Sequence, residues 1–265
     1  MGTWRGKWAV VTGASSGIGR ALAVELAAGG AHLVLTARRR ERLEELAGEF
    51  AAKYGVRSEI CVTDLAERFG PEEVFAFTKG KGIDVELLVN NAGFGAYGEF
   101  ARMDLARMLE MVQVNVAAVV HLTHLYLQPM IERKRGYILI VASTAAFQGV
   151  PYLTAYGATK GFDLLFAEAL AEETRACGVR VCALCPGTTA SEFQEVAGQP
   201  KRVQRKKETA EKVARTGLRA LESGKHYVVS GASNYLGMQA QRLLPRGVVT
   251  RVVEKIFRPK PDEGV

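Results

Sequence analysis

The stretch Thr12-Gly13-Ala14-Ser15-Ser16-Gly17-Ile18-Gly19 decides the fold class of this 265-residue chain. A β-branched run at residues 7–12 precedes it, and an amphipathic run at residues 17–28 follows with helical spacing. Its glycines permit a tight turn and a close backbone approach to a phosphate, and the N-terminus of the following helix offers free N–H groups to an anion. The spacing G-x-x-x-G-x-G therefore predicts a strand, a turn that binds an anionic group, and a helix.

Downstream of this turn, short β-branched runs alternate with longer amphipathic segments. Continuous apolar strands separated by helices indicate βαβ units and a parallel sheet. We therefore expect an α/β fold, a Rossmann-like doubly wound parallel sheet of about seven strands with helices on both faces, in a single domain over residues 1–265. The predicted strands are residues 7–12, 31–36, 56–62, 85–89, 137–142, 179–184 and 226–229, and the predicted long helices include 17–28, 40–54, 71–79, 104–133 and 156–175.

Composition places the chain among globular proteins. Apolar residues make up 48% of it and charged residues 24%, as in soluble domains. Arg and Glu residues interrupt the apolar runs, so we expect no membrane-spanning helix, and residues 1–8 lack the apolar core of a signal peptide. The formal net charge of +7 fits an anionic cofactor or substrate, although a generally basic surface explains it as well.

The four cysteines are Cys61, Cys177, Cys182 and Cys185, and their spacing forms no framework of metal ligands. Cys182 and Cys185 have C-x-x-C spacing, but they fall in a run typical of a strand, where positions i and i+3 face opposite sides. We therefore expect no metal site, and we expect buried, reduced thiols, which favour a cytoplasmic location.

The basic run Arg38-Arg39-Arg40 follows the second predicted strand. An acidic residue at this place binds the adenosine ribose of NAD, whereas basic residues suit the 2′-phosphate of NADP. A solvated helix start is the alternative, but cations near a helix N-terminus are mildly unfavourable. We therefore expect Arg38 and Arg39 to bind a 2′-phosphate, and NADP(H) to be preferred over NAD(H). Asp64 follows the third strand, where it accepts from the adenine amino group or caps the next turn.

Tyr156 and Lys160 stand four residues apart in a predicted helix, so their side chains share one helical face. A tyrosine with a pKa of about 10 exchanges protons poorly at neutral pH. A nearby lysine charge favours the phenolate and moves that pKa toward the working range. Such pairs are also common surface contacts, so the rest of the sequence decides between catalysis and a surface pair.

Taken in order, these features resemble the short-chain dehydrogenase/reductase family, in its single-domain branch, over roughly residues 5–230. Ser143 precedes Tyr156 by 13 residues (156 − 143), the interval usual in that family. The subgroup that the chain resembles contains broad carbonyl reductases and ketoacyl or hydroxysteroid reductases. The residues and motifs that carry the resemblance are Thr12–Gly19, Asp64, Asn90-Asn91-Ala92-Gly93, Asn115, Ser143, Tyr156-x-x-x-Lys160 and Pro186-Gly187.

The resemblance implies a catalytic set of Asn115, Ser143, Tyr156 and Lys160. Tyr156 would donate the proton in reduction and accept it in oxidation, while Lys160 would lower the pKa of the phenol and hold the nicotinamide ribose. Ser143 would hydrogen-bond the substrate oxygen; alternatively, it is a small polar residue that ends the fifth strand. Asn115 would hold a water in a proton relay; alternatively, its side chain bonds to the helix backbone.

The resemblance also implies a cofactor site and a substrate lid over residues 188–212. Beyond the resembling part, apolar helical segments near residues 236–244 and 248–257 predict a C-terminal helical tail over residues 233–258. The family usually has Thr where Ser191 stands, so the hydroxyl is kept but its orientation is less fixed. By position, the cofactor-binding residues are Gly13, Ser15, Ser16, Gly17, Ile18, Gly19, Arg38, Arg39, Asp64, Leu65, Asn91, Ala92, Gly93, Tyr156, Lys160, Pro186, Gly187, Thr189 and Ser191.

These expectations converge on NADPH-dependent reduction of a ketone or aldehyde by hydride transfer, with Tyr156 as proton donor. A 3-oxoacyl thioester, on coenzyme A or acyl carrier protein, is the alternative substrate. A non-catalytic dinucleotide-sensing protein is the alternative from another class, and the intact catalytic set argues against it. The family implies a homodimer or homotetramer packed through residues 104–133 and 156–177. The tail joins that interface, lines the substrate pocket or lies on a membrane.

The run Lys201-Arg202-Val203-Gln204-Arg205-Lys206-Lys207 makes the lid basic. It lacks the interleaved aromatic residues of a nucleic-acid surface, so we expect no nucleic-acid partner. The run is a solvated loop, or it attracts the phosphates of a carrier-bound thioester. His121 and His124 have no clear carboxylate partner in the sequence, so we interpret them as helix-face residues.

Overall fold

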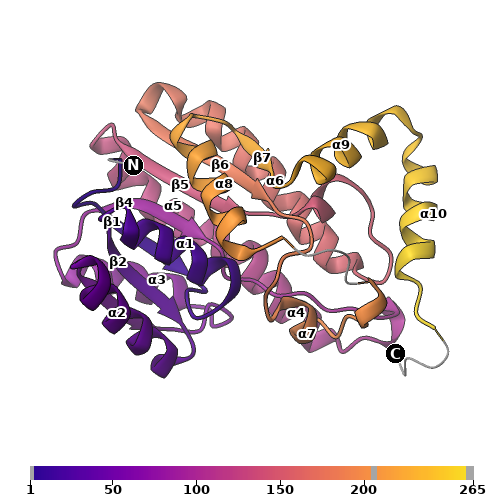
Figure 1. Cartoon of the computed structure of the whole chain (residues 1–265), viewed down its shortest axis with the longest axis horizontal. Helices are drawn as coiled ribbons and strands as arrows, with labels where there is room; N and C mark the ends of the chain where they lie inside the picture. Colours follow the sequence, from indigo (N-terminus) through magenta and orange to yellow (C-terminus); the bar gives the residue numbers. More distant parts are fainter. Residues whose placement is uncertain (1–2, 204–207, 261–265) are drawn as a thin grey trace.

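The sheet organises the molecule. The computed structural model describes residues 3–203 and 208–260, and within them seven parallel strands form one sheet in the order β3-β2-β1-β4-β5-β6-β7 (Figure 1). The expected doubly wound α/β fold is therefore confirmed. The strands are β1 Trp8–Thr12, β2 His32–Ala37, β3 Ser58–Val62, β4 Val85–Asn90, β5 Gly136–Val141, β6 Val179–Cys185 and β7 Tyr227–Val229.

Helices cover both faces of the sheet, because successive strand residues face opposite sides and the strands place apolar residues on both. The helices α1 (Gly17–Ala28), α2 (Arg40–Tyr54) and α8 (Ala210–Glu222) pack on one face. The helices α3 (Gly70–Gly80), α5 (Ala118–Glu132) and α6 (Thr154–Thr174) pack on the other. Cys182 and Cys185 belong to the two different cores, as their spacing predicted.

The helical run expected over residues 104–133 is interrupted by a π-helical turn. It consists of α4 (Leu105–Val112), a π turn (Gln113–Ala117) and α5. The expectation that no segment is long and apolar enough to cross a membrane is wrong, since Leu105–Glu132 passes that test by length and composition among the described residues. Because α5 packs against β4, β5 and α3, this helix forms a layer of the fold.

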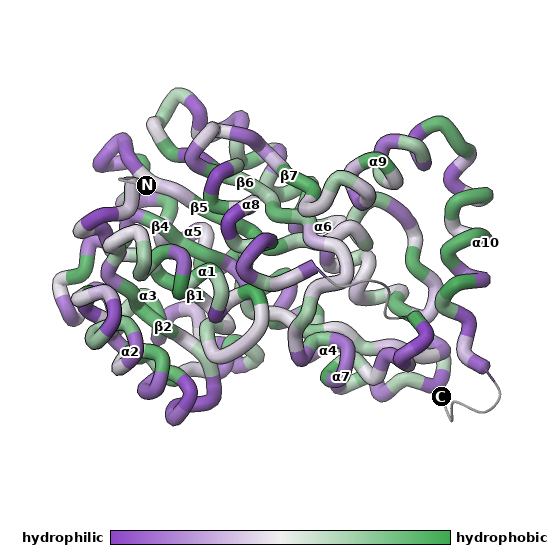
Figure 2. The backbone as a smooth tube through the Cα atoms, in the orientation of Figure 1, coloured by the Kyte–Doolittle hydropathy of each residue, from purple (hydrophilic) through white to green (hydrophobic). Residues whose placement is uncertain are grey.

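The expected lid and tail contain short helices. The lid, residues 188–212, holds α7 (Phe193–Val196) and a 3₁₀ turn (Lys201–Val203) before α8. The tail forms α9 (Ala232–Ala240) and α10 (Arg246–Phe257), which extend as an arm beside the sheet (Figure 1). Apolar and polar residues alternate along α10 (Figure 2). The remaining 3₁₀ turns are Phe100–Arg102, Thr144–Phe147, Arg175–Cys177 and Gln241–Leu243.

Candidate active site

The glycine-rich turn joins β1 to α1. Gly13 and Gly17 adopt φ angles of +65° and +54°, which residues with a side chain rarely enter. At Gly19, an added Cβ would overlap the carbonyl oxygen of Gly13 and the side-chain amide of Asn91. Ser16 stands at the N-terminus of α1 and, in the described part of the chain, makes no side-chain cap bond. The first N–H groups of α1 are therefore available to an anion.

Thr12 fastens the turn after β4 to the end of β1. Its hydroxyl donates to the carbonyl of Val89 at 3.1 Å and accepts from the N–H groups of Asn91 and Ala92 at 2.8 and 2.9 Å. Asn91 returns a bond from its amide to the Thr12 carbonyl at 2.8 Å. Because the strand order reverses between β1 and β4, this is the crevice where ligands bind in doubly wound sheets.

A cavity of about 620 Å³ opens at this edge of the sheet. The expected catalytic residues line it, except Asn115, and so do the expected cofactor-binding residues, except Gly19. The tertiary structure thus brings together groups that lie far apart in the sequence. The expected residues that line the cavity are Gly13, Ser15, Ser16, Gly17, Ile18, Arg38, Arg39, Asp64, Leu65, Asn91, Ala92, Gly93, Ser143, Tyr156, Lys160, Pro186, Gly187, Thr189 and Ser191.

Arg39 contacts the glycine-rich turn directly. Its Nε and Nη2 atoms lie 3.3 and 3.0 Å from Ser15 Oγ. Its Nη1 atom lies 2.9 Å from Glu192 Oε2, a carboxylate of the lid. Arg39 is therefore a cation beside the glycine-rich turn, and in this structure an acidic side chain of the lid binds it.

Arg38 points to a different set of partners. Its Nη1 atom lies 3.5 Å from Asp64 Oδ2 and 3.7 Å from Glu110 Oε1. Asp64 also accepts from the backbone N–H of Ala66 at 2.9 Å through Oδ1. Of the two roles expected for Asp64, the structure shows the cap of the following turn.

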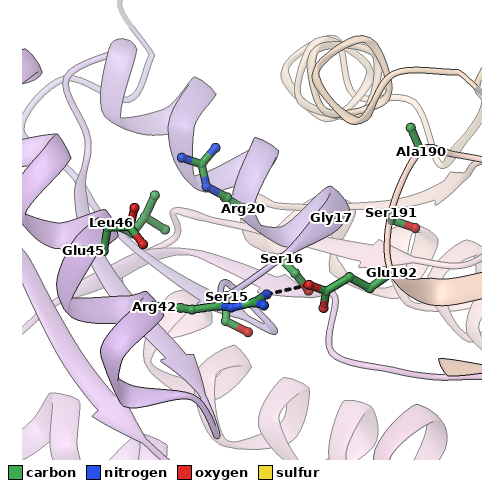
Figure 3. Close-up of a pocket in the computed structure, with 10 residues that line it drawn as sticks. All are labelled: Ser15, Ser16, Gly17, Arg20, Arg42, Glu45, Leu46, Ala190, Ser191 and Glu192. Atoms are coloured by element: carbon green, nitrogen blue, oxygen red, sulfur yellow. Dashed lines mark hydrogen bonds and ion pairs between the residues drawn. The ribbon is translucent and has the colours of Figure 1, made fainter. Parts of the chain in front are cut away.

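A second cavity, of about 400 Å³, lies between α1, α2 and the lid, next to the glycine-rich turn (Figure 3). Arg42 on α2 reaches Glu192, with Nη1 2.6 Å from Oε1. Hydrogen bonds from Arg42 and Arg39 hold the pKa of Glu192 below its ordinary value. Neither Glu192 nor Arg42 was expected from the sequence, because their pairing joins residues 150 positions apart.

Tyr156 lies buried in the first turn of α6. Burial raises the pKa of its phenol, and this effect outweighs the Lys160 charge and a hydrogen bond from Ser143, both of which lower the pKa. The expected effect of Lys160 is therefore right in direction, but the net pKa shift is upward because desolvation is larger. Ser143 follows β5 in an extended conformation and also accepts from the N–H of Ala145 at 3.1 Å.

Lys160 lies one turn further along α6, with its ammonium buried. Its Nζ atom donates to the Val141 carbonyl at 2.8 Å and to Asp163 Oδ2 at 2.9 Å. Gly93, in the turn after β4, comes close to this ammonium: a Cβ there would lie 3.6 Å from Nζ and 2.8 Å from Asn115 Oδ1. A glycine at position 93 therefore lets the turn after β4 lie close to Asn115 and to the Lys160 ammonium.

Asn115 is fully buried in the π-helical turn. Its Oδ1 accepts from the Phe94 N–H at 3.1 Å, and its Nδ2 donates to the Phe94 carbonyl at 2.9 Å and to Thr159 Oγ1 at 3.1 Å. The side-chain amide is thus used to fix the loop after β4 to α6. A π turn widens the helix and is often found at functional sites.

The segment after β6 closes the cavity. The Pro186 carbonyl accepts from Thr144 N–H at 2.9 Å, and a Cβ at Gly187 would overlap the side chain of Asn234. The Thr189 hydroxyl donates to the Gly187 carbonyl at 3.0 Å. Ser191 Oγ accepts from the N–H of Phe193 at 3.3 Å, so its hydroxyl is held at the start of α7.

The far end of the cavity is apolar. Phe193 of the lid packs on Tyr156, with ring centroids 5.0 Å apart. The tail supplies one wall, and Tyr97 Oη donates to the Phe257 carbonyl at 2.6 Å, which anchors α10 there. Of the roles open for the tail, lining the pocket is the one the structure shows. The apolar lining includes Phe94, Val150 and Leu153, which were not expected from the sequence, and Val253, Ile256 and Phe257 of the tail.

Within the described ranges, no cluster of three or more His, Cys, Asp or Glu side chains is arranged to hold a metal ion. His121 does have a carboxylate neighbour that the sequence did not reveal, since Nε2 lies 3.2 Å from Glu72 Oε1. The pair arises because α3 packs against α5.

Known proteins share this sequence and fold. The family described as short chain dehydrogenase matches residues 7–202. A very-long-chain 3-oxoacyl-CoA reductase of Anas platyrhynchos is 35% identical over 203 residues, which cover 74% of this chain and 64% of that protein. The human inactive hydroxysteroid dehydrogenase-like protein 1 is 36% identical over 184 residues, which cover 68% of this chain and 55% of that protein. The chain thus matches less than two thirds of the length of these relatives.

A short-chain dehydrogenase from Sphingobium yanoikuyae, solved in complex with NADPH, has the same fold. It superposes with a TM-score of 0.81 at 25% identity, over 92% of this chain and 95% of that one. The sequence match covers the glycine-rich turn, Ser143, Tyr156 and Lys160, and the sheet order agrees with the fold. On this basis the chain belongs to the short-chain dehydrogenase/reductase family.

Proposed function

We propose that the protein is an NADPH-dependent oxidoreductase that reduces a ketone or aldehyde to an alcohol. One observation carries the proposal: Ser143, Tyr156 and Lys160 line the same cavity as the glycine-rich turn and two arginines. A proton donor, an oxygen-binding hydroxyl and a cation thus share one space with an anion-binding turn.

The residues present fit a nicotinamide dinucleotide phosphate. The turn at Gly13 and Gly17, with the uncapped N-terminus of α1, suits a pyrophosphate. Arg39 already binds an anionic side chain, Ser15 lies beside it, and Arg38 lines the same part of the cavity, so these three would hold the 2′-phosphate. The bound cofactor would supply the hydride. Asp64, Leu65, Ala92, Gly93, Pro186, Gly187, Thr189 and Ser191 would line its path through the cavity.

In this mechanism Tyr156 gives its phenolic proton to the substrate oxygen, and Ser143 donates a second hydrogen bond to the same oxygen. Both act where negative charge develops as the carbonyl is reduced, so they favour the transition state over the ground state. Lys160 holds a positive charge beside the phenol and would bind the nicotinamide ribose. The π turn at Asn115 would hold the water of a proton relay through its backbone, because the side-chain amide is already bonded to Phe94 and Thr159.

The apolar end of the cavity favours a substrate with an apolar body. A free ketone of steroid-like or aromatic type fits this lining, and the hydride chemistry is the same for a 3-oxoacyl thioester. The name of the Anas platyrhynchos relative supports the thioester. The basic run of the lid bears on this choice, but residues 204–207 lie outside the described residues. Within the described part, Arg202 donates to the Ile256 carbonyl at 3.1 Å, which ties the lid to α10.

A dinucleotide-sensing protein without catalysis remains the second class of function. The name of the human inactive relative shows that proteins similar to this chain include one described as inactive. Here the four expected catalytic residues are all present, and a binding protein does not need all four. The activity assay below separates the two classes.

We further propose a homodimer or homotetramer in a reducing, cytoplasmic compartment. Large apolar side chains on α4 and α6 face outward, with Leu109 and Leu165 exposed to 58% and 68%. Such side chains on adjacent helices are typical of a surface that a second copy covers. Three of the four free cysteines are buried, which supports a reducing location.

The experiment is NADPH consumption by the purified chain with an aromatic ketone, a steroid ketone and a 3-oxoacyl-CoA, each repeated with NADH. We expect turnover with at least one carbonyl and a preference for NADPH. Arg38→Asp and Arg39→Asp should each weaken NADPH binding by about ten- to a hundred-fold and spare NADH, because a guanidinium–phosphate bond contributes about 1.5–3 kcal/mol. Dinucleotide binding without turnover on any carbonyl would favour the sensing protein.

A further inference from the structure

Asp163 is a buried carboxylate that the mechanism above does not use. It lies one turn after Lys160 on α6, is 1% exposed, and its Oδ2 atom is 2.9 Å from Lys160 Nζ. Its Oδ1 atom is also buried and has no hydrogen-bond partner among the described residues. Burying an ionised carboxylate costs several kcal/mol unless an opposite charge and hydrogen bonds offset it. The burial of Asp163 is therefore costly unless the carboxylate has a structural or functional role.

The contact uses part of the bonding capacity of Lys160. An ammonium has three N–H donors, and Asp163 and the Val141 carbonyl accept two of them. One donor is then left for the ribose or the phenol. The two contacts fix Nζ beside Gly93, where the cofactor-facing turn passes. Asp163 thus limits where the ammonium can move.

Asp163 also changes the net charge of the buried cluster that it forms with Tyr156 and Lys160. Consider the net charge of the Tyr156, Lys160 and Asp163 side chains together, with Asp163 ionised and Lys160 protonated. This net charge is zero when Tyr156 holds its proton, and −1 when Tyr156 is a phenolate. Without the carboxylate, the same two states carry +1 and 0. In a buried site the neutral state is favoured, because an uncompensated charge is costly there. The carboxylate therefore decides which form of Tyr156 is the neutral one.

We propose that Asp163 is a positioning residue, which holds Lys160 in place and keeps Tyr156 protonated, so that the site is set to donate a proton to a carbonyl rather than to accept one from an alcohol. The inference rests on the proposed function for its meaning in catalysis. Its physical content, the protonation state of Tyr156, is independent of any substrate.

Other charged and titratable groups around the cluster do not replace Asp163. Cys185 at the end of β6 also acts on Lys160, but burial raises the pKa of this thiol, which keeps it neutral. Ser143 lowers the pKa of Tyr156 through a hydrogen bond, and it carries no charge. Burial is the largest cause of the raised pKa of Tyr156, and the charge of Asp163 adds to it; the same charge raises the pKa of Lys160 against the lowering by burial. Burial raises the pKa of Asp163 itself, and the Lys160 charge opposes that rise.

The first test needs no substrate. Tyrosinate absorbance at 295 nm is followed from pH 7 to 12 in the full chain and in Asp163→Asn. The same titration of each protein with Tyr156→Phe added is subtracted, which leaves the ionisation of Tyr156. We expect the ionisation step that belongs to Tyr156 to occur at lower pH in Asp163→Asn. Asp163→Glu should restore the original step. Glu168→Gln, an acid on the same helix without a contact to Lys160 in the described structure, is the matched control.

The second test uses the reaction. Because reduction needs protonated Tyr156, the fall in reduction rate with rising pH should begin at lower pH in Asp163→Asn, and the ratio of rates at pH 6.5 and pH 9 should therefore be higher than in the unmodified chain. KM for the carbonyl should stay constant, because Asp163 does not line the cavity. If Asp163→Asn does not fold, Asp163→Ser is used as the neutral variant in both tests. An unchanged tyrosine step in both neutral variants would overturn the inference, whereas a moved step with no turnover in the unmodified chain would refute only the proposed function.

Discussion

The carboxylate of Glu192 lies 2.9 Å from the guanidinium of Arg39, so a side chain of the lid binds the arginine that contacts the glycine-rich turn. Arg42 binds the same carboxylate from α2 at 2.6 Å. The three side chains are 40–46% exposed, so solvent weakens the ion pairs. An anionic ligand at Arg39 therefore competes with Glu192 at a small cost.

We expect Glu192→Gln to strengthen NADPH binding by about two- to five-fold and to leave NADH binding unchanged, since partly exposed ion pairs contribute up to about 1 kcal/mol. Titration of cofactor fluorescence at low and high salt measures both affinities. Glu195→Gln is the control, because Glu195 lies in the same segment and forms no ion pair within the described ranges. Equal strengthening for NADH would show that Glu192 does not compete with the 2′-phosphate.

We expect Tyr156→Phe to lower the rate of carbonyl reduction by about 10²- to 10⁴-fold, the contribution usual for a proton donor. NADPH affinity should stay within a few-fold, because Phe keeps the packing against Phe193. Tyr152→Phe is the control, since its hydroxyl bonds to Glu254 at 3.1 Å outside the proposed chemistry. More than about a tenth of the original rate in Tyr156→Phe would remove Tyr156 as the proton donor.

Two helical glycines should respond to alanine in opposite ways. At Gly19 the new Cβ would overlap backbone and the Asn91 amide, so we expect Gly19→Ala to lower the free energy of unfolding by about 1–3 kcal/mol. Gly48 on α2 has nothing within 4 Å of the Cβ position, so Gly48→Ala should raise it by about 0.5–1 kcal/mol. Urea unfolding of both variants measures these changes, and a stable Gly19→Ala would contradict the close packing of the turn.

The thiols should differ in reactivity at pH 8. Burial raises the pKa of Cys182 to about 12 and also raises that of Cys61, so few of these thiols ionise near neutral pH. Cys177 is only partly buried. We expect a thiol reagent to label one cysteine in the folded protein and all four after denaturation, and none in folded Cys177→Ser. Rapid labelling of two or more in the folded protein would contradict the burial.

The outward apolar face of α4 should determine the oligomeric state. We expect Leu109→Glu to convert the oligomer to a monomer with little loss of stability, since Leu109 is 58% exposed in the single chain. Light scattering after size exclusion measures the mass. Phe69→Glu, at a side chain exposed to 59% at the start of α3, is the control. A Leu109→Glu protein of unchanged mass would exclude this face as the interface.

The local pattern of the sequence was sufficient for the fold. The period of apolar residues and the glycines at 13, 17 and 19 predict the order of strands and helices, because both depend on neighbours along the chain. The predicted bounds of α1 and α2 agree with the structure, and other elements differ at their ends by a few residues. The π turn was not foreseen, because apolar spacing does not distinguish it from an α-helix.

Predicting the site required both the sequence spacing and the tertiary structure. Sequence spacing identified Ser143, Tyr156 and Lys160 as candidates, since their intervals match a family pattern. Only the tertiary structure showed that burial, rather than the Lys160 charge, has the larger effect on the pKa of Tyr156. Desolvation depends on atoms brought from other elements, so no local pattern reports it.

What the sequence by itself determined is the parallel sheet, the anion-binding turn and the candidate catalytic residues, because each is encoded by short-range periodicity or spacing. What only the tertiary structure decided is the pairing of Glu192 with Arg39 and Arg42, and the burial of Asp163 beside Lys160. The first pairing joins segments about 150 residues apart, and the second depends on which face of α6 the sheet covers. Electrostatic contacts act through space, so their partners are set by packing and not by distance along the chain.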